Sequence, residues 1–151
     1  MQDLVSLASQ FINTTSSHIF LTGKAGTGKT TFLRNLQDHT HKRFIVVAPT
    51  GIAALNAGGT TIHSQFLIPP STFVPDRSAE GAAGGLRITS PHILSRHHPL
   101  NQERKRVLRA IDLLVIDEVS MLRADLLDAI DSRLRSARGN FRQSFGGVQV
   151  L

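Results

Sequence analysis

Residues 23–30 constrain this chain more than any other segment, because they carry the spacing G-x-x-x-x-G-K-[ST] in full. They follow a short apolar run and precede a stretch of helical character. Glycines let such a loop turn tightly, so that successive backbone N–H groups converge on one anion. A helix that begins at the end of the loop adds the positive end of its dipole. The motif therefore predicts a phosphate-binding loop in the strand–loop–helix context that it requires.

The side chains at the end of this loop have distinct expected roles. Lys29 should reach the β- and γ-phosphates of a nucleoside triphosphate, and the Thr30 hydroxyl should ligate Mg²⁺. Thr31 is a candidate contact to a more distant phosphate. ATP and Mg²⁺ are therefore the expected cofactors. The other expected cofactor-binding positions are Gly23, Ala25, Gly26, Thr27 and Gly28.

A pair of acids follows the apolar run at residues 113–116. In open α/β sheets, ligands gather at the carboxyl ends of parallel strands. Asp117 is therefore expected to hold Mg²⁺, and Glu118 to orient or deprotonate an attacking water. Lys29 and Glu118 become the candidate catalytic residues, and water is favoured as the phosphoryl acceptor.

Candidate strands alternate with candidate helices along the chain. The apolar runs are continuous rather than alternating, which is typical of strands covered on both faces. This order predicts an α/β fold with a mainly parallel sheet. The candidate strands are residues 19–22, 44–48, 113–116 and 148–151, and the candidate helices are residues 4–12, 30–36, 51–57, 101–110 and 122–134.

Helical spacing also predicts the apolar faces of two helices. Leu4, Leu7, Ala8 and Phe11 form the apolar stripe of the first helix, and Thr50 is placed to cap the helix at 51–57. In the last helix the stripe is interpreted as core packing. Its members are Leu122, Leu126, Leu127, Ile130 and Leu134.

Residues 68–100 interrupt this regularity with scattered prolines and glycines. We expect a long irregular loop there, and loops of this length in a compact domain are usually functional or mobile. A chain of 151 residues suits one domain with one core. Because residues 148–151 begin a strand where the sequence stops, we expect a truncated domain over 1–151.

The net charge of +6 suggests an anionic partner, most simply nucleic acid. No apolar run approaches the roughly 20 residues of a membrane span, and the first residues do not resemble a secretory signal. We therefore expect a cytoplasmic protein with no membrane partner, associated with the nucleoid if the source is bacterial. Two groups of basic residues are expected on solvated faces, with DNA contact as the alternative. They are Arg104, Lys105, Arg106 and Arg109 in one helix and Arg123, Arg133 and Arg135 in or beside another.

Several blocks occur in the order and approximate spacing of one family. The sequence resembles superfamily 1B helicases of the petite-integration-frequency (Pif) type, relatives of RecD. The phosphate motif is common to many NTPases, whereas the combination with the later blocks is much more specific. The blocks are residues 23–30, 48–54, 61–64 and 115–121, and residues 145–151 are similar to the approach to motif III.

The resemblance implies an ATP-driven motor that moves 5′ to 3′ on single-stranded DNA. This chain would be its first, RecA-like three-layer domain, in a monomer whose second RecA-like domain lies elsewhere in the full-length protein. The family's DNA-lining segments match residues 48–54 and 61–64, with a helix cap and a structural histidine as the alternative roles there. The implied DNA contacts are Pro49, Thr50, Gly51 and His63.

Two other functions account for parts of the sequence. A different P-loop NTPase or nucleotide kinase explains residues 23–30 but leaves residues 61–64 without a role. A nucleic-acid-binding module with a structural ATP site suits the charge, but Trp and Tyr are absent, so an aromatic stacking platform is missing. Because a second domain would supply arginines to the γ-phosphate, we expect this chain alone to bind ATP with little turnover.

Overall fold

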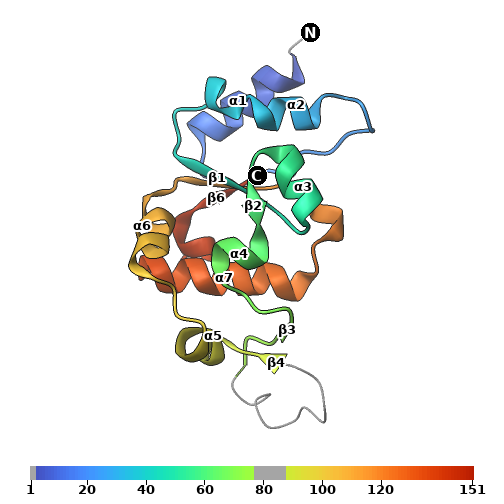
Figure 1. Cartoon of the computed structure of the whole chain (residues 1–151). Helices are drawn as coiled ribbons and strands as arrows, with labels where there is room; N and C mark the ends of the chain where they lie inside the picture. Colours follow the sequence, from blue (N-terminus) through green and yellow to red (C-terminus); the bar gives the residue numbers. More distant parts are fainter. Residues whose placement is uncertain (1–2, 77–87) are drawn as a thin grey trace.

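A four-stranded parallel sheet lies at the centre of the molecule, in a computed structural model that describes residues 3–76 and 88–151. Its strand order is β2-β1-β5-β6, and every neighbouring pair is parallel. A second, two-stranded parallel sheet joins β3 to β4 (Figure 1). The strands are β1 (Phe44–Ala48), β2 (Thr60–Thr61), β3 (Thr72–Phe73), β4 (Ile88–Thr89), β5 (Leu113–Ile116) and β6 (Gln149–Val150).

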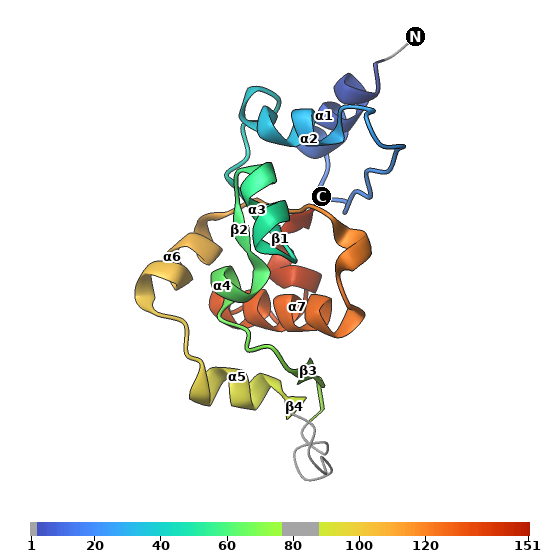
Figure 2. The same ribbon diagram turned by 45° about the vertical axis from the view of Figure 1, so that its right-hand side comes forward.

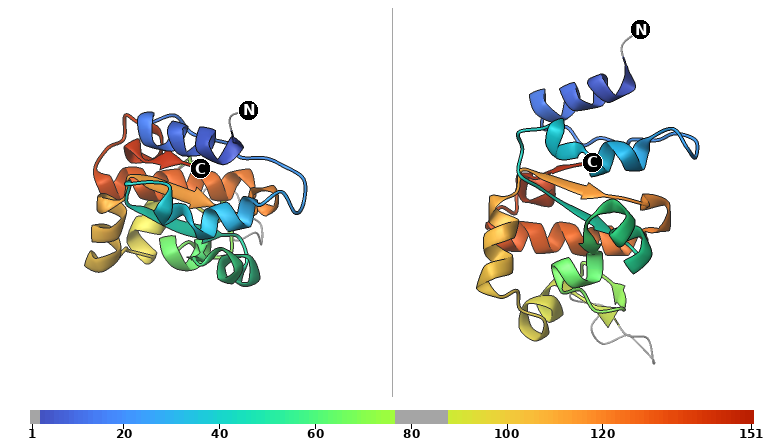
Figure 3. Two further views of the ribbon diagram at one scale, coloured as in Figure 1. Left: turned by 90° about the horizontal axis from the view of Figure 1, so that it is seen from above. Right: turned by 45° about the horizontal axis from the view of Figure 1, so that its top comes forward.

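Helices cover both faces of the four-stranded sheet (Figures 1 and 3). On one face lie α1 (Leu4–Thr14) and α2 (Lys29–Arg34), and on the other lies α7 (Ala124–Arg138) with α4 (Ile62–Phe66) and α6 (Gln102–Ala110) beside it. Figure 2 shows α5 (Pro91–His97) farther from the sheet, with the β3–β4 pair. The remaining elements are α3 (Gly51–Ala57), η1 (Leu36–Asp38), η3 (Val119–Met121) and η4 (Ser144–Gly147).

Strand β5 shows why its sequence is apolar throughout. All four of its side chains are buried. Leu113 and Val115 pack with the residues of α1 and α2, whereas Leu114 and Ile116 pack with those of α7. Successive residues of a strand point to opposite faces, so a strand between two helical layers needs apolar residues at every position. The predicted α/β fold with a parallel sheet is confirmed.

The predicted core stripe of α7 is confirmed, because Ile130 and Leu134 are fully buried. The helix expected at residues 4–12 forms as α1, and Ala8 of its predicted stripe is buried. Two other members of the stripe, Leu4 and Phe11, are 75% and 48% exposed, and Ile12 is buried in their place. Asn13 holds α1 in this orientation about its axis. Its amide nitrogen donates to His39 O at 2.8 Å, and its amide oxygen accepts from the Thr40 hydroxyl at 2.7 Å.

The strand expected at residues 19–22 does not form. Ile19 N–H donates to Val150 O at 2.8 Å, but Phe20 is 75% exposed. Side chains take the places of the other backbone partners. The N–H of Val150 donates to Nδ1 of His18 at 3.1 Å, and the Gln149 amide donates to Ser17 O at 2.7 Å. The segment therefore runs beside β6 without completing a strand.

The described part of residues 68–100 is more regular than expected, since it contains β3, β4 and α5. Arg133 on α7 binds this segment at both ends. Its guanidinium donates to Leu67 O at 2.8 Å, to Leu94 O at 3.3 Å and to His98 O. The side chain was expected on a solvated face, but Arg133 is only 4% exposed. Among the residues described, none belongs to a helix long and apolar enough to cross a membrane.

Candidate nucleotide-binding site

The glycine-rich loop between residues 23 and 30 has the backbone that its sequence predicts. Gly26 and Gly28 have φ of +78° and +90°, in the left-handed region that other residues avoid. Gly28 is also the N-cap of α2, and no side chain caps that end. Inside the loop, the Thr27 hydroxyl donates to Lys24 O at 2.8 Å. The first N–H groups of α2 thus remain available to an anion at the end of the loop.

Lys29, the first residue of α2, folds back over this loop. Its ammonium donates to Gly23 O at 2.6 Å and to Lys24 O at 2.9 Å. A phosphate held by the loop amides would compete with these carbonyls for the ammonium, and charge-assisted hydrogen bonds to an anion are the stronger ones. The side chain is therefore within reach of the predicted phosphate position.

The acidic pair lies at the carboxyl end of β5, where the sequence places it. Asp117 N–H donates to Val47 O at 2.9 Å, which continues the β1–β5 pairing by one residue. The Asp117 carboxylate in turn accepts from Glu118 N–H at 2.9 Å. Glu118 has φ +53° and ψ +44°, a left-handed conformation that costs a residue other than glycine about 1–2 kcal/mol. The left-handed backbone turns the chain sharply at this residue, and the Glu118 side chain is exposed.

One cavity brings the loop and the acidic pair together. Its volume is about 670 Å³, within the range of small-molecule sites. From the predicted site, its wall includes Gly23, Ala25, Lys29, Asp117 and Glu118. The other predicted positions of the loop do not line it, namely Gly26, Thr27, Gly28, Thr30 and Thr31. Two segments separated by nearly ninety residues of sequence thus share one hollow at the carboxyl end of the sheet.

The oxygen donors near this cavity suit Mg²⁺. Mg²⁺ is usually bound by one or two carboxylates, water and the phosphates of its substrate, rather than by a cage of protein ligands. Asp117 offers a carboxylate and Thr30 an exposed hydroxyl, both hard oxygen ligands. Over residues 3–76 and 88–151, no group of three or more His, Asp or Glu residues gathers as a metal cage. Asp117 and Thr30 would therefore fit Mg²⁺ that is bound together with phosphates.

The apolar side of this cavity was not expected from the sequence. Phe20 and Phe145 line it together with β6. Phe145 has φ +52° and meets the ring of His18 edge-on, with 5.3 Å between centroids. The signal available was the Phe-Gly-Gly at residues 145–147, where glycines allow the sharp turn.

The candidate DNA contacts lie outside the nucleotide cavity. Thr50 caps α3, because its hydroxyl accepts from Ala53 N–H at 3.2 Å, and Gly51 beside it is exposed. His63 is half-buried and contacts Ile68 O through Nδ1 at 2.8 Å. It lines a second cavity of about 400 Å³ with Arg123. The helix cap and the structural histidine are thus both present, and the DNA contacts of Pro49, Thr50, Gly51 and His63 stay predictions.

Sequence comparisons place these features in a family. The PIF1-like helicase family model matches residues 3–76. The ATP-dependent DNA helicase PIF1 of Saccharomyces cerevisiae (strain YJM789) is 37% identical over 141 residues, covering 89% of this chain and 14% of the yeast protein. The ATP-dependent DNA helicase Pif1 of Psychrobacter sp. (strain PRwf-1) is 34% identical over 144 residues, covering 91% of this chain and 19% of that protein.

Solved structures of Pif1 helicases also match this chain. Pif1 from Bacteroides sp in complex with ADP-AlF4 matches with a TM-score of 0.81 at 39% identity, covering 99% of this chain and 30% of that one. Bacteroides Pif1 bound to ssDNA matches with a TM-score of 0.79, also at 39% identity, with the same coverage. The chain thus spans less than a third of each relative's length. With the phosphate loop and the acidic pair in one cavity, these matches show that the chain belongs to the PIF1-like helicase family.

Proposed function

We propose that this chain is the ATP-binding part of the motor of a DNA helicase, which couples ATP hydrolysis to 5′-to-3′ movement on single-stranded DNA in its full-length protein. The observation that carries the proposal is the shared cavity of Lys29, Asp117 and Glu118. A relative that binds ADP-AlF4 and one that binds ssDNA support the two ligands. The family also argues against a nucleotide kinase and against a purely structural ATP site.

The predicted site residues have separate parts in this proposal. The loop amides and the Lys29 ammonium would bind and orient the phosphates, which is most of what phosphoryl transfer needs from a protein. Thr30 and Asp117 would hold Mg²⁺, which neutralises charge on the phosphates when bound. Glu118 would orient the attacking water and accept its proton. Its exposed carboxylate, next to Asp117, faces the same cavity.

Fast turnover needs groups beyond this cavity. An arginine that reaches the γ-phosphate from another domain or subunit can raise the rate by about 10³–10⁵. In the described part of the chain, no arginine lines the cavity. The chain by itself should therefore bind ATP and hydrolyse it slowly, and rapid hydrolysis should need a second domain.

Titration calorimetry with ATP and Mg²⁺ tests the phosphate assignment. Lys29→Ala should abolish binding, because it removes the charge that reaches the phosphates. Lys24→Ala is the matched control, since Lys24 lies in the same loop but does not line the cavity. Glu118→Gln should keep binding, and it should remove turnover in the two-domain protein. Unchanged ATP affinity in Lys29→Ala would refute the assignment, and full hydrolysis by Glu118→Gln would remove its role as base.

The single-strand path needs its own experiment. A variant with Thr50→Ala and His63→Ala should bind a single-stranded oligonucleotide more weakly at low salt, with ATP binding unchanged. Thr50→Ser is the control, because serine keeps both the hydroxyl and the helix cap. Equal single-strand affinity in the wild type and both variants would show that these residues do not contact DNA.

A further inference from the structure

The segment formed by α5 and α6 carries a large part of the net positive charge of the chain. Residues 91–110 hold five of the 17 basic residues and only one of the 11 acids, so they carry four of the six net positive charges. Three of the five follow one face of α6, at positions related by three and four residues. They are Lys105, Arg106 and Arg109, hereafter the α6 basic face.

The cations of the α6 basic face are free to bind an anion. Lys105 is half-buried and Arg106 exposed, and neither side chain makes a hydrogen bond or ion pair with any residue in 3–76 or 88–151. Arg109 donates only its Nε hydrogen, to Ala137 O at 2.7 Å. Like charges at this spacing repel one another by a few tenths of a kcal/mol per pair. The α6 basic face thus carries positive charge that no ion pair within the described residues neutralises.

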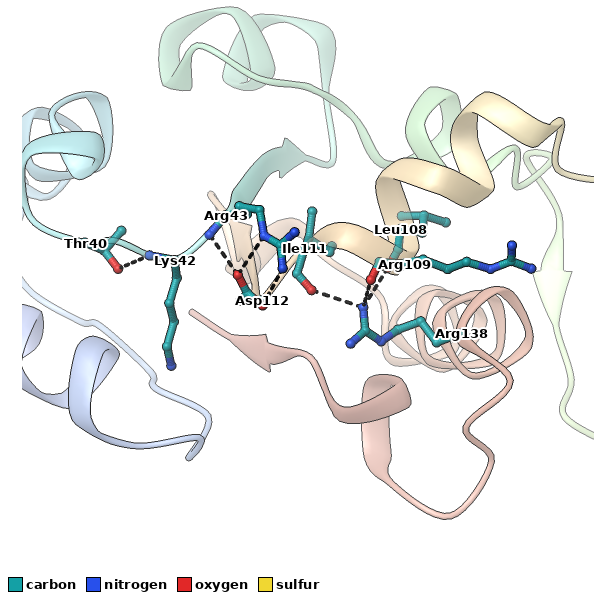
Figure 4. Close-up of polar contacts among 8 residues, drawn as sticks. All are labelled: Thr40, Lys42, Arg43, Leu108, Arg109, Ile111, Asp112 and Arg138. Carbon is teal, nitrogen blue, oxygen red and sulfur yellow. Dashed lines mark hydrogen bonds and ion pairs between the residues drawn. The ribbon is translucent and has the colours of Figure 1, made fainter.

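The helix that carries this face is held firmly. Arg138 donates to Leu108 O and Arg109 O, each at 2.9 Å, and to Ile111 O at 3.1 Å, which satisfies the last carbonyls of α6 (Figure 4). On its other side, Arg104 donates to the carbonyl of Ser64 in α4. Arg106 and Arg109 are exposed on this helix, and Figure 4 shows the Arg109 side chain extending away from the contacts of Arg138.

The α6 basic face lies at the opposite end of the sheet from the nucleotide cavity. α6 leads through Ile111 and Asp112 into the start of β5, whereas Asp117 follows the end of that strand. Figure 1 shows α6 on the side away from α3. The candidate contacts at residues 49–51 follow the end of β1, on the cavity side. The α6 basic face is therefore separate from the proposed nucleotide site and from those three single-strand contacts.

The chemistry of the face favours a phosphate backbone over bases. Residues 91–110 contain no Phe, Trp or Tyr, so they offer no surface on which an unpaired base could stack. A duplex, with one charge per about 1.7 Å of its axis, presents the denser array of phosphates. Lysine and arginine on a rigid helix suit this backbone without reading sequence.

We propose that the α6 basic face binds the backbone of duplex DNA, as a second contact with nucleic acid besides the proposed single-strand path. It would hold the duplex at the edge of the domain where β1 and β5 begin. The contact is electrostatic, so it should be independent of sequence and should weaken steeply with salt.

Fluorescence anisotropy of the whole chain with a labelled blunt duplex of about 20 base pairs tests this proposal across a salt series. The variant Lys105→Gln with Arg106→Gln should bind the duplex about tenfold more weakly at low salt. The slope of log K against log[salt] should become shallower by about 1.8, or about 0.9 for each phosphate that the variant no longer neutralises. Arg106→Gln alone, at an exposed position, should give about half the change in slope.

The control removes the same charge elsewhere. Arg34→Gln with Arg142→Gln changes two exposed arginines outside α6 and should alter duplex binding much less. An unchanged slope in the α6 variant, or an equal reduction in the control, would overturn the proposal. An equal reduction for single-stranded oligonucleotide would overturn the choice of duplex. ATP affinity should be the same in all these proteins, so a failure here is distinct from a failure of the nucleotide site.

Discussion

Glu118 combines a strained backbone with a proposed catalytic role. It has a left-handed backbone that disfavours side chains, yet its carboxylate is the proposed base. Replacing it with glycine should relieve the strain and raise the free energy of unfolding by about 1 kcal/mol. Urea unfolding measures this gain. In the two-domain protein the same change should remove ATP turnover.

Glu118→Ala separates the two effects. Alanine also lacks the carboxylate, but it keeps the Cβ atom that disfavours φ of +53°. It should therefore lose turnover without gaining stability. If alanine and glycine stabilise the chain equally, the gain comes from removing the charge, and the strain is not stored at this residue.

Asp112 illustrates the opposite case, a charge that supports the fold. A hydrogen bond from the Arg43 side chain holds the pKa of Asp112 below its ordinary value. The ionised carboxylate therefore stabilises the fold above the pKa of the unfolded chain, and this contribution is lost as the pH falls through the folded pKa. Asp112→Asn should lower the free energy of unfolding at pH 7 by less than about 1 kcal/mol, since the pair is exposed to solvent. The difference from the wild type should shrink in acid, as unfolding curves at several pH values would reveal.

At the scale of the elements, one buried arginine of α7 holds the chain just after α4 and at the end of α5. Burial lowers the pKa of Arg133 to about 10, and no carboxylate within the described ranges pairs with it. Its stabilising contacts are the carbonyls of Leu67, Leu94 and His98. Arg133→Met fills the space but leaves these carbonyls without their donor. We expect a loss of about 2–4 kcal/mol in unfolding free energy and faster proteolysis between α4 and α6.

Arg133→Lys is the matched control, because it keeps the charge but not the planar fork. A single ammonium cannot reach carbonyls from both sides as the guanidinium does, so lysine should restore little of the stability. Full recovery with lysine would mean that the charge, rather than the geometry of the three hydrogen bonds, holds the segment.

The elements that sequence predicted well are those fixed by local signals. Continuous apolar runs marked β1 and β5, and Thr50 and the glycine spacing marked the starts of α3 and α2. The strand wrongly expected at residues 19–22 depends on a distant partner. There, His18 and Gln149 side chains take the hydrogen bonds that a ladder would use. No local sequence pattern reveals that side chains will replace backbone groups as hydrogen-bond partners.

The candidate site was likewise predicted where local motifs determine it and missed where distant segments meet. The loop and the acidic pair were predicted from short motifs, and their shared cavity follows from the parallel sheet. The apolar wall of Phe20 and Phe145 comes from segments far apart in sequence, which periodicity cannot bring together. Arg133 was misplaced for a related reason: a charged side chain is expected in water unless its buried carbonyl partners are known.

At the scale of the whole molecule, the nucleotide cavity and the α6 basic face lie at opposite ends of one sheet. Ligands at two separate sites should each stabilise the fold, and their effects should add if no element couples them. A ligand at about 100 times its Kd contributes about 2.7 kcal/mol. For a domain of this size, that raises the melting temperature by about 5–10 °C.

Thermal unfolding with ATP and Mg²⁺, with duplex DNA, and with both together tests this independence. The two increments should sum in the wild type. Lys29→Ala should lose only the nucleotide increment, and Lys105→Gln with Arg106→Gln only the DNA increment. A combined shift much larger or smaller than the sum would mean that β5, which runs from one site to the other, transmits binding between them. If the increments add, the nucleotide and the duplex are not coupled within this chain. Any coupling between them would then need other parts of the full-length protein.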